Sequence, residues 1–270
     1  MEEKNRSMKI SAAIIAYNEE DRLPDTLASL EGVADEVVVI DSYSSDRTVE
    51  IARNAGARVI QNRFEDYGQQ KNFAMAQAGH DWILNLDADE RLSPELKRAL
   101  TALREKGEPV DVTAFTIKRK TYYLGRWIRH SGWYPDRKVR LFRKEAASWQ
   151  GRVHERLNVG GAVAPLPGDI LHFTYRDIGD HVRRLERYAT FQAEEIVKDG
   201  KSCLYLRLLI LPSVTFFRHY LWRLGLLDGF PGLVIAMVSS WGTAMKYMKA
   251  IALKRRQKRP ACKRRERALK

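Results

Sequence analysis

Three carboxylates stand within four positions of one another at the end of an apolar run. The run is WILNL, residues 82–86, and Asp87, Asp89 and Glu90 follow it. Clustered carboxylates repel one another and resist burial, so they need water, a metal cation or basic partners. Asp-x-Asp at a strand end offers two hard oxygen donors, the chemistry that holds Mg²⁺ or Mn²⁺ on a diphosphate. The alternative is a solvated turn ahead of the helix that Ser93 begins.

Polar residues also follow two earlier apolar runs. Ile10 to Ala16 ends in Tyr17-Asn18-Glu19, and Val37 to Ile40 ends in Asp41, with helical patterns after each loop. Strands that are continuous apolar runs alternating with helices predict an α/β fold, a Rossmann-like and mostly parallel sheet with helices on both faces. Ligands of such sheets bind beyond the carboxyl ends of the strands. We therefore expect these loops and the carboxylates after residue 86 to face one crevice.

Motifs and composition narrow the class of protein. The chain has no G-x-G-x-x-G and no G-x-x-x-x-G-K-[ST], which disfavours a dinucleotide fold and a P-loop. With 270 residues and 44% hydrophobic content it can bury a sizeable core, and its 2 cysteines have no metal-type spacing, so a reducing compartment is expected. The first residues hold acidic side chains and no apolar segment of the secretory type.

Several stretches carry a resemblance to a known family. SAAIIAYNEE, EVVVIDSYSSDRTVEIA and GQQKNFAMAQAGHDWILNLDADERL resemble the nucleotide-sugar-binding half of family 2 glycosyltransferases, which have a GT-A fold. KVRLFRKEAASWQGRVHERL and DILHFTY resemble the acceptor half, and HYLWRLGLLDGFPGL the membrane-proximal end, of a subgroup that includes lipopolysaccharide core β-glucosyltransferases. The resemblance implies a GT-A domain over 8–200, made of a nucleotide-sugar half (8–110) and an acceptor half (111–200).

The resemblance also implies roles on the donor side. A nucleotide sugar, with UDP-hexose expected, would be bound by residues at the strand ends, namely Tyr17, Asn18, Glu19, Asp41 and Asp87, and by Lys71 of the helix expected over Gln69 to Ala78. Many relatives have Asp-Asp-Gly-Ser after the second strand, whereas this chain has Asp41-Ser42-Tyr43-Ser44, which weakens base recognition by Asp41. For Asn18, Glu19, Asp41 and Lys71, helix capping or an ordinary surface charge is the competing interpretation.

A divalent cation, Mg²⁺ or Mn²⁺, and a catalytic base complete the implied site. The metal ligands would be Asp87, Asp89 and His172, with Asp87 alternatively reaching the ribose and His172 alternatively a satisfied core histidine. Inverting transfer of a hexose needs a base for the acceptor hydroxyl, and Glu155 is the candidate. His154 beside it would orient the site or be the base itself. A plain edge strand is the alternative for this segment.

Two further groups fit an anionic or sugar acceptor. Aromatic rings and cations gather between residues 122 and 134, where rings would stack on sugar faces, or where a loop would be packed by its own aromatics. Arg140 and Arg143 would contact a diphosphate or an anionic acceptor, or would form the polar face of an alternating strand.

The C-terminal third is apolar and then strongly basic. Residues 201–253 predict hydrophobic helices, in which 229–245 holds no charge, and 254–270 has ten Lys or Arg against one Glu. We expect a membrane-associating helical segment with a basic tail on an anionic leaflet, at the cytoplasmic face of the inner membrane. A buried helical hairpin is the alternative.

The expected acceptor is a sugar of the lipopolysaccharide core or a related cell-envelope glycan, with a lipid-linked or other surface-polysaccharide acceptor as the alternative. Two other classes of protein remain to be weighed. A nucleic-acid-binding protein would explain the net charge of +13 but not a carboxylate-lined crevice, so no nucleic acid is expected. A nucleotidyltransferase would need a Gly-rich phosphate loop near the N-terminus, and AYNEEDRL has no glycine.

Overall fold

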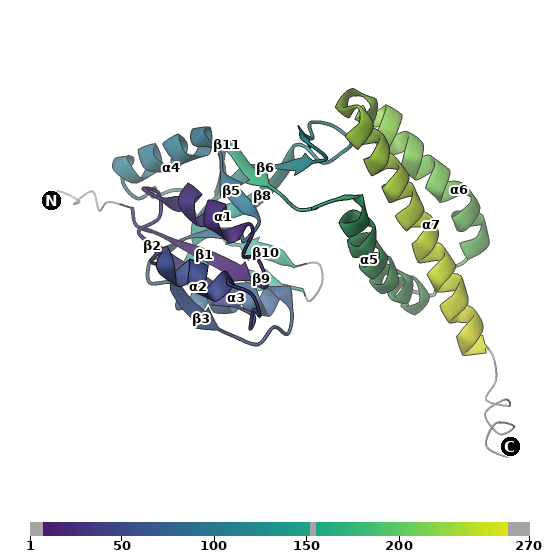
Figure 1. The fold of residues 1–270 in the computed structure, drawn as a ribbon, viewed down its shortest axis with the longest axis horizontal. Coiled ribbons are helices and arrows are strands. Elements are labelled where there is room, and N and C mark those ends of the chain that lie inside the picture. The colour runs from purple at the N-terminus through teal and green to yellow at the C-terminus, as the bar shows by residue number, and fades with distance from the viewer. Residues whose placement is uncertain (1–7, 152–154, 259–270) are drawn as a thin grey trace, which may run out of the picture. The chain divides into compact units, whose positions relative to one another are not determined.

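The computed structural model describes residues 8–151 and 155–258, which form two compact units (Figure 1). Unit 1 ends its first segment at Thr121 and resumes over Pro135–Phe173. Unit 2 combines Tyr122–Tyr134 with the described residues from Thr174 onward. The expected domain boundary at residue 200 therefore lies inside unit 2. His154 and the tail beyond residue 258 lie outside the described residues.

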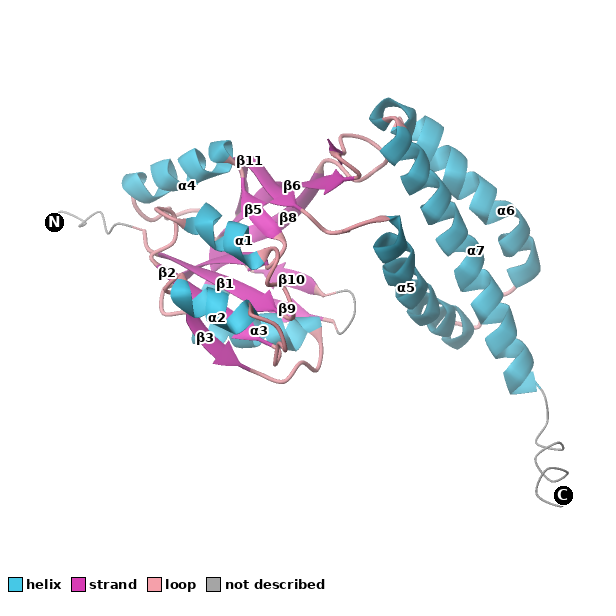
Figure 2. Ribbon diagram, in the orientation of Figure 1, coloured by secondary structure: helices cyan, strands magenta, loops and turns pink. Residues whose placement is uncertain are grey.

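Unit 1 is built on a mixed, mostly parallel sheet (Figure 2). Its strands, in spatial order, are β3 (Arg58–Gln61), β2 (Glu36–Asp41), β1 (Ile10–Ala16), β4 (Trp82–Asp87), β8 (Asp136–Arg143), β6 (Ala114–Tyr123), β11 (Val163–His172) and β5 (Glu90–Leu92). The first four strands are parallel, and β8 and β5 run antiparallel to their neighbours. The predicted α/β class is confirmed.

Helices cover both faces of the sheet, as the buried runs of its strands require. One face packs against α1 (Leu23–Leu30), α2 (Thr48–Asn54) and α4 (Pro94–Lys106). The other packs against α3 (Tyr67–Gln77) and a hairpin of β9 (Ala147–Gln150) and β10 (Arg156–Val159). Ser93 caps α4, where its hydroxyl accepts the Leu96 amide at 3.1 Å. The strand end and the helix start are thus separate features, and the carboxylates of residues 87–90 are not the cap.

The register of the parallel strands brings their carboxyl ends together. Ala16 at the end of β1 lies opposite Asp41 at the end of β2. Ile15 lies opposite Asp87 at the end of β4. The three loops that follow these strands therefore start at one edge of the sheet, as the sequence predicts.

Unit 2 is a helical unit built from α5 (Ile178–Lys198), α6 (Leu204–Phe217) and α7 (Phe230–Lys258). A π-helical turn (Arg218–Trp222) and a 3₁₀ turn (Gly225–Asp228) connect α6 to α7. Both α5 and α6 pack along α7. None of the helices in the described part of the chain is both long and apolar enough to cross a membrane. The predicted C-terminal helices are therefore present, without a span.

The 122–134 segment, which leads from the end of β6 towards β8, contributes to the core of unit 2. Tyr123 is fully buried among Ile128, Val234 and Ile235, and Trp133 packs on this cluster. A short strand, β7 (Arg126–Trp127), pairs with the last two residues of β6. Tyr123 and Trp133 thus pack on each other and also on α7, whereas the sequence alternative was packing within the loop alone.

Candidate active site

The loops after β1 and β2 are tied to each other by Asn18. Its backbone has a φ of 54°, a left-handed conformation that asparagine tolerates better than most residues. The Asn18 side-chain oxygen accepts the Ser45 amide at 2.8 Å, and the Asn18 amide donates to the Ser44 hydroxyl at 2.9 Å. Tyr17 beside it is 59% exposed. Asn18 therefore connects the two loops by hydrogen bonds, while the neighbouring Tyr17 side chain is accessible to a ligand.

Asp41 is fully buried and directed at its own loop. Its carboxylate accepts the Ser44 amide at 3.1 and 3.2 Å and the Gln61 side-chain amide at 3.2 Å. These bonds hold the Ser42–Ser45 segment against the end of β3. The Asp41 carboxylate is thus already engaged by donors of the protein. Its role in nucleoside binding stays a prediction.

Asp87 lies between two cations. Its carboxylate is 3.2 Å from Lys71 Nζ and 3.2 Å from a guanidinium nitrogen of Arg140. Desolvation alone raises the pKa of this carboxyl, but Lys71 and Arg140 outweigh it and hold the pKa far below its ordinary value. Asp87 is therefore ionised, and its charge is balanced by side chains of α3 and β8.

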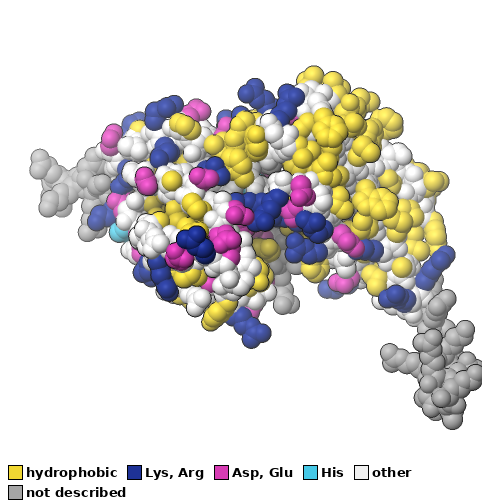
Figure 3. Space-filling model, in the orientation of Figure 1, with side chains coloured by type: hydrophobic (Ala, Val, Ile, Leu, Met, Phe, Trp, Pro, Cys, Tyr) yellow, Lys and Arg dark blue, Asp and Glu magenta, His cyan; other side chains and the backbone are white. Residues whose placement is uncertain are grey.

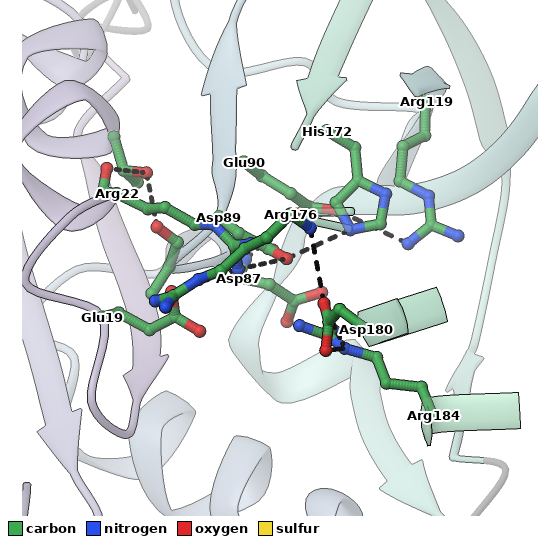
Figure 4. A network of polar contacts seen from close by, with 12 residues as sticks. Glu19, Arg22, Asp87, Asp89, Glu90, Arg119, His172, Arg176, Asp180 and Arg184 are labelled. Atoms are coloured by element: carbon green, nitrogen blue, oxygen red, sulfur yellow. Dashed lines mark hydrogen bonds and ion pairs between the residues drawn. The ribbon is translucent and has the colours of Figure 1, made fainter. Parts of the chain in front are cut away.

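Asp89 meets His172 and Arg22, as Figure 4 shows. The Asp89 carboxylate is 3.5 Å from His172 Nε2 and 3.9 Å from the Arg22 guanidinium. Burial raises the pKa of Asp89, and the charge and hydrogen bond of His172 lower it below its ordinary value. Arg22 is also 3.4 Å from Glu19. The predicted neighbours Asp89 and His172 do lie together, although 83 positions of chain separate them.

Lys71 joins the donor-side carboxylate to the predicted base. Its Nζ is 3.2 Å from Asp87 and 3.1 Å from Glu155 Oε1, and it lies 4.7 Å from the centre of the Trp149 ring. The Lys71 side chain is 4% exposed and that of Glu155 is 21% exposed. Glu155 is thus held at the site while it keeps contact with solvent. Its catalytic role, like that of His154, stays a prediction.

Sequence reasoning missed the basic partners that neutralise the carboxylate cluster. Arg140 contacts the fully buried Glu90 at 2.6 Å, and Arg119 lies 3.6 Å from the same carboxylate. The other oxygen of Glu90 accepts the Asp87 amide at 3.0 Å. Burial lowers the pKa of Arg140, but the carboxylates of Glu90 and Asp87 raise it by more. The pKa of Arg140 therefore lies above its ordinary value. The alternation of residues along β8 indicated a polar position at Arg140. The sequence alone did not show which carboxylates Arg140 would contact.

The residues beside Asp89 fit a divalent cation that shares its coordination with a diphosphate. One carboxylate and one imidazole are donors that Mn²⁺ accepts, and Mg²⁺ is commonly held by one or two carboxylates plus phosphate oxygens. Nδ1 of His172 is buried and has no hydrogen-bond partner among the described residues, so this ring is not committed to the core. Residues 8–151 and 155–258 contain no group of three His, Cys, Asp or Glu side chains placed to hold a metal. All three predicted metal ligands, Asp87, Asp89 and His172, stay predictions.

Comparison with known proteins identifies the family. A family model described as glycosyl transferase family 2 matches residues 11–156, which include the strand ends, Lys71 and Glu155. That span is more than half of the 270-residue chain. The chain belongs to glycosyl transferase family 2. It is a glycosyltransferase, as its motifs predict, and the nucleotidyltransferase alternative is set aside.

Relatives of this glycosyltransferase match along nearly its whole length. It is 31% identical over 264 residues to the lipopolysaccharide core biosynthesis glycosyltransferase LpsC of Rhizobium meliloti, covering 92% of this chain and 95% of LpsC. It is 30% identical to an uncharacterized glycosyltransferase of Rickettsia typhi, over 89% of this chain and 86% of that protein. The likeness to LpsC includes the C-terminal helices, not the sheet alone.

Solved structures match the glycosyltransferase only in part. The crystal structure of glucosyl-3-phosphoglycerate synthase from Mycobacterium tuberculosis, in complex with Mn²⁺, UDP and glucosyl-3-phosphoglycerate, is 26% identical with a TM-score of 0.34. The match covers 44% of this chain and 45% of that one. Because the overlap is this limited, it carries no conclusion about ligands.

Proposed function

We propose that this enzyme transfers a hexose, glucose being the expected one, from a UDP-sugar to a sugar of the lipopolysaccharide core or a related cell-envelope glycan. The class of acceptor is supported by the likeness to LpsC over 92% of the chain. The class of donor is supported by the family and by the carboxylates and cations at the strand ends. With a glycolipid acceptor, the reaction would run at the cytoplasmic face of the inner membrane.

The observation that carries the proposed chemistry is the position of Lys71 between Asp87 and Glu155, at 3.2 and 3.1 Å. Lys71 thereby links the side of the site that would hold the diphosphate to the carboxylate that would receive a proton. A transferase needs these two functions within reach of one anomeric carbon. A module that only bound nucleotide would have no use for the second carboxylate.

In the proposed reaction the acceptor hydroxyl oxygen attacks the anomeric carbon from the face opposite the diphosphate. The new carbon–oxygen bond forms while the bond to the diphosphate oxygen breaks, so the configuration inverts. The hydroxyl proton passes to the carboxyl group of Glu155, which Lys71 keeps in place at 3.1 Å. Lys71 and Arg22 lie on the diphosphate side of the site, where both are paired with carboxylates of the protein.

A divalent cation would be held by Asp89 and His172, with Asp87 as the further predicted ligand. The chemistry that it supplies when bound is neutralisation of charge on the departing diphosphate. Arg22 keeps the Asp89 carboxylate at this place, since it bridges Asp89 and Glu19 at 3.9 and 3.4 Å. Glu90 accepts the backbone amide of Asp87 at 3.0 Å and is itself paired with Arg140, so these two residues hold the backbone that precedes Asp89.

The first test is UDP binding by calorimetry, with and without Mn²⁺, for the wild type and Asp89→Asn. We expect binding that requires Mn²⁺ and is weakened at least tenfold by Asp89→Asn, because a cation ligand is lost. Asp111→Asn, an exposed carboxylate in the loop before β6, is the matched control and is expected to bind like the wild type. If neither UDP nor GDP, CDP or dTDP binds, the proposed donor class is wrong.

The acceptor is tested separately. Transfer of labelled glucose from UDP-glucose to lipopolysaccharide with a truncated core is compared with transfer to a lipid-linked oligosaccharide. We expect Glu155→Gln to bind UDP like the wild type and to lose at least about a hundredfold in kcat, because general-base catalysis contributes that much. Unchanged kcat in Glu155→Gln would remove Glu155 from the mechanism.

A further inference from the structure

The most exposed apolar surface of unit 2 lies on α6 and on the turns that follow it. Leu209 is 76% exposed and Trp222 is 88% exposed. Further exposed apolar side chains of this surface are Leu206, Ile210, Val214, Phe217, Leu221, Leu224, Leu226 and Leu227. Figure 3 shows hydrophobic side chains gathered over α6 and its connection to α7. We call this set, from Leu206 to Leu227, the α6 surface.

The apolar character of the α6 surface is not needed for the core. Part of the uncharged 229–245 run faces inward: Val234, Ile235 and Val238 are buried against α5 and the 122–134 segment, and Ala236 is also buried. Phe230, Met237 and Trp241 of the same run are exposed. In α6 only Leu204 is buried, and Leu208 and Leu211 pack partly on α7. The side of α6 away from α7 could be polar without cost to packing, and it is apolar.

The charges around the α6 surface have one sign. Arg207 and Arg218 are exposed among the apolar side chains, and Arg223 follows Trp222. The residues that line an open groove on this surface include Val214, Phe217, Leu221 and Trp222 together with Arg218 and Arg223. From residue 200 to residue 258 the acidic side chains are limited to Asp228, which is 1% exposed. Exposed apolar groups interleaved with arginines and free of exposed carboxylates match an anionic lipid headgroup layer.

We propose that the α6 surface docks on an anionic phospholipid membrane, with the side chains around Leu209 and Trp222 entering the acyl boundary. Arg207, Arg218 and Arg223 then meet lipid phosphates. A second copy of the chain fits this surface poorly, because its own α6 surface carries the same arginines and no exposed carboxylate to pair with them. This proposal is independent of the donor and the acceptor.

The test is sedimentation of the full chain with vesicles of phosphatidylcholine, with and without phosphatidylglycerol. It is run at about 0.1 M and about 0.5 M NaCl, where screening shortens from about 10 Å to about 4 Å. The variant Leu209→Ser/Trp222→Ser removes two inserting groups, and Arg218→Gln removes one phosphate contact. Val110→Ser is the matched control, since Val110 is 86% exposed and belongs to unit 1. Circular dichroism checks that each variant is folded.

We expect the wild type to bind vesicles with phosphatidylglycerol and to stay partly bound at the higher salt. The double variant should bind at least about tenfold more weakly, since it loses two buried apolar side chains. Arg218→Gln should bind about fivefold more weakly, and Val110→Ser like the wild type. Equal binding of the double variant and the wild type overturns the proposal. So does a dimer in sedimentation velocity that the double variant dissolves, because a second copy would then cover the surface.

Discussion

Replacing Arg140 by methionine should destabilise unit 1, because the buried carboxylate of Glu90 would lose its nearest cation. The Arg140 side chain is 5% exposed, Glu90 is 0% exposed, and the two meet at 2.6 Å. Removing one partner of a buried ion pair costs about 3–5 kcal/mol, because the other charge stays buried. Arg119, at 3.6 Å, remains as a second cation for Glu90. We therefore expect the lower end, about 3 kcal/mol, for Arg140→Met.

A double-mutant cycle separates this charge effect from lost packing. Glu90→Gln should cost only about 1–2 kcal/mol, since Arg140 keeps Asp87 at 3.2 Å and the amide oxygen can still accept the Asp87 amide. In Arg140→Met/Glu90→Gln no buried charge is stranded at position 90. The double variant should thus be more stable than the sum of the single changes predicts, by about 1 kcal/mol or more.

The assay is urea unfolding followed by circular dichroism, with hydrogen exchange of β4 peptides to follow unit 1 by itself. Arg98→Met, at an exposed position of α4, is the matched control and should change stability by less than about 0.5 kcal/mol. An Arg140→Met variant within about 1 kcal/mol of the wild type, together with additive single changes, would refute the reasoning. It would mean that water or Arg119 alone compensates Glu90.

Three further outcomes are expected. Burial lowers the pKa of His181 from 6.5 to about 4, so as the pH falls this histidine binds its proton at a higher pH in the unfolded chain than in the folded one. Unit 2 should therefore lose up to about 3 kcal/mol as pH falls from 6.5 to 4, and His181→Gln should lack that part of the slope in thermal melts. Gly168→Ala should cost more than about 2 kcal/mol in urea unfolding, because its φ is +92° and a Cβ would collide with the backbone nitrogen of Leu96. Gly32→Ala, with a φ of +75° and open space, should cost only about 1–2 kcal/mol. Asp228→Asn should speed hydrogen exchange at residues 129 and 130, whose amides Asp228 accepts at 3.0 and 2.9 Å; unchanged exchange would contradict this.

The parallel half of the fold was predictable because its signals are local. β1, β2 and β4 are continuous apolar runs that end in polar loops, so each could be located from its own residues. The rest depends on pairings between distant segments. β8 inserts between β4 and β6, and β11 pairs with both β6 and β5, contacts that no local pattern specifies. The boundary between the two units depends on distant contacts too, since an amphipathic helix such as α5 can pack on a sheet or on other helices.

At the site, residue types were predictable and partners were not. Asp89 and His172 were expected together, and they meet at 3.5 Å. Arg22 and Arg140 were not assigned to the carboxylates, although the chemistry of a carboxylate cluster demands basic partners or a metal. A spacing rule cannot find Arg140, because it reaches Asp87 and Glu90 through antiparallel pairing of β8 with β4.

These partners bear on how a diphosphate can bind. Each carboxylate of the cluster already has a cation within 4 Å: Lys71 and Arg140 for Asp87, Arg22 for Asp89, and Lys71 for Glu155. The protein's own charges are thus paired without a ligand, and a diphosphate would add negative charge with little left to neutralise it. It must arrive with a divalent cation or draw Lys71 away from Asp87. Strong UDP binding without metal, lost in Lys71→Met, would indicate the second route; binding that needs Mn²⁺ and tolerates Lys71→Met would indicate the first.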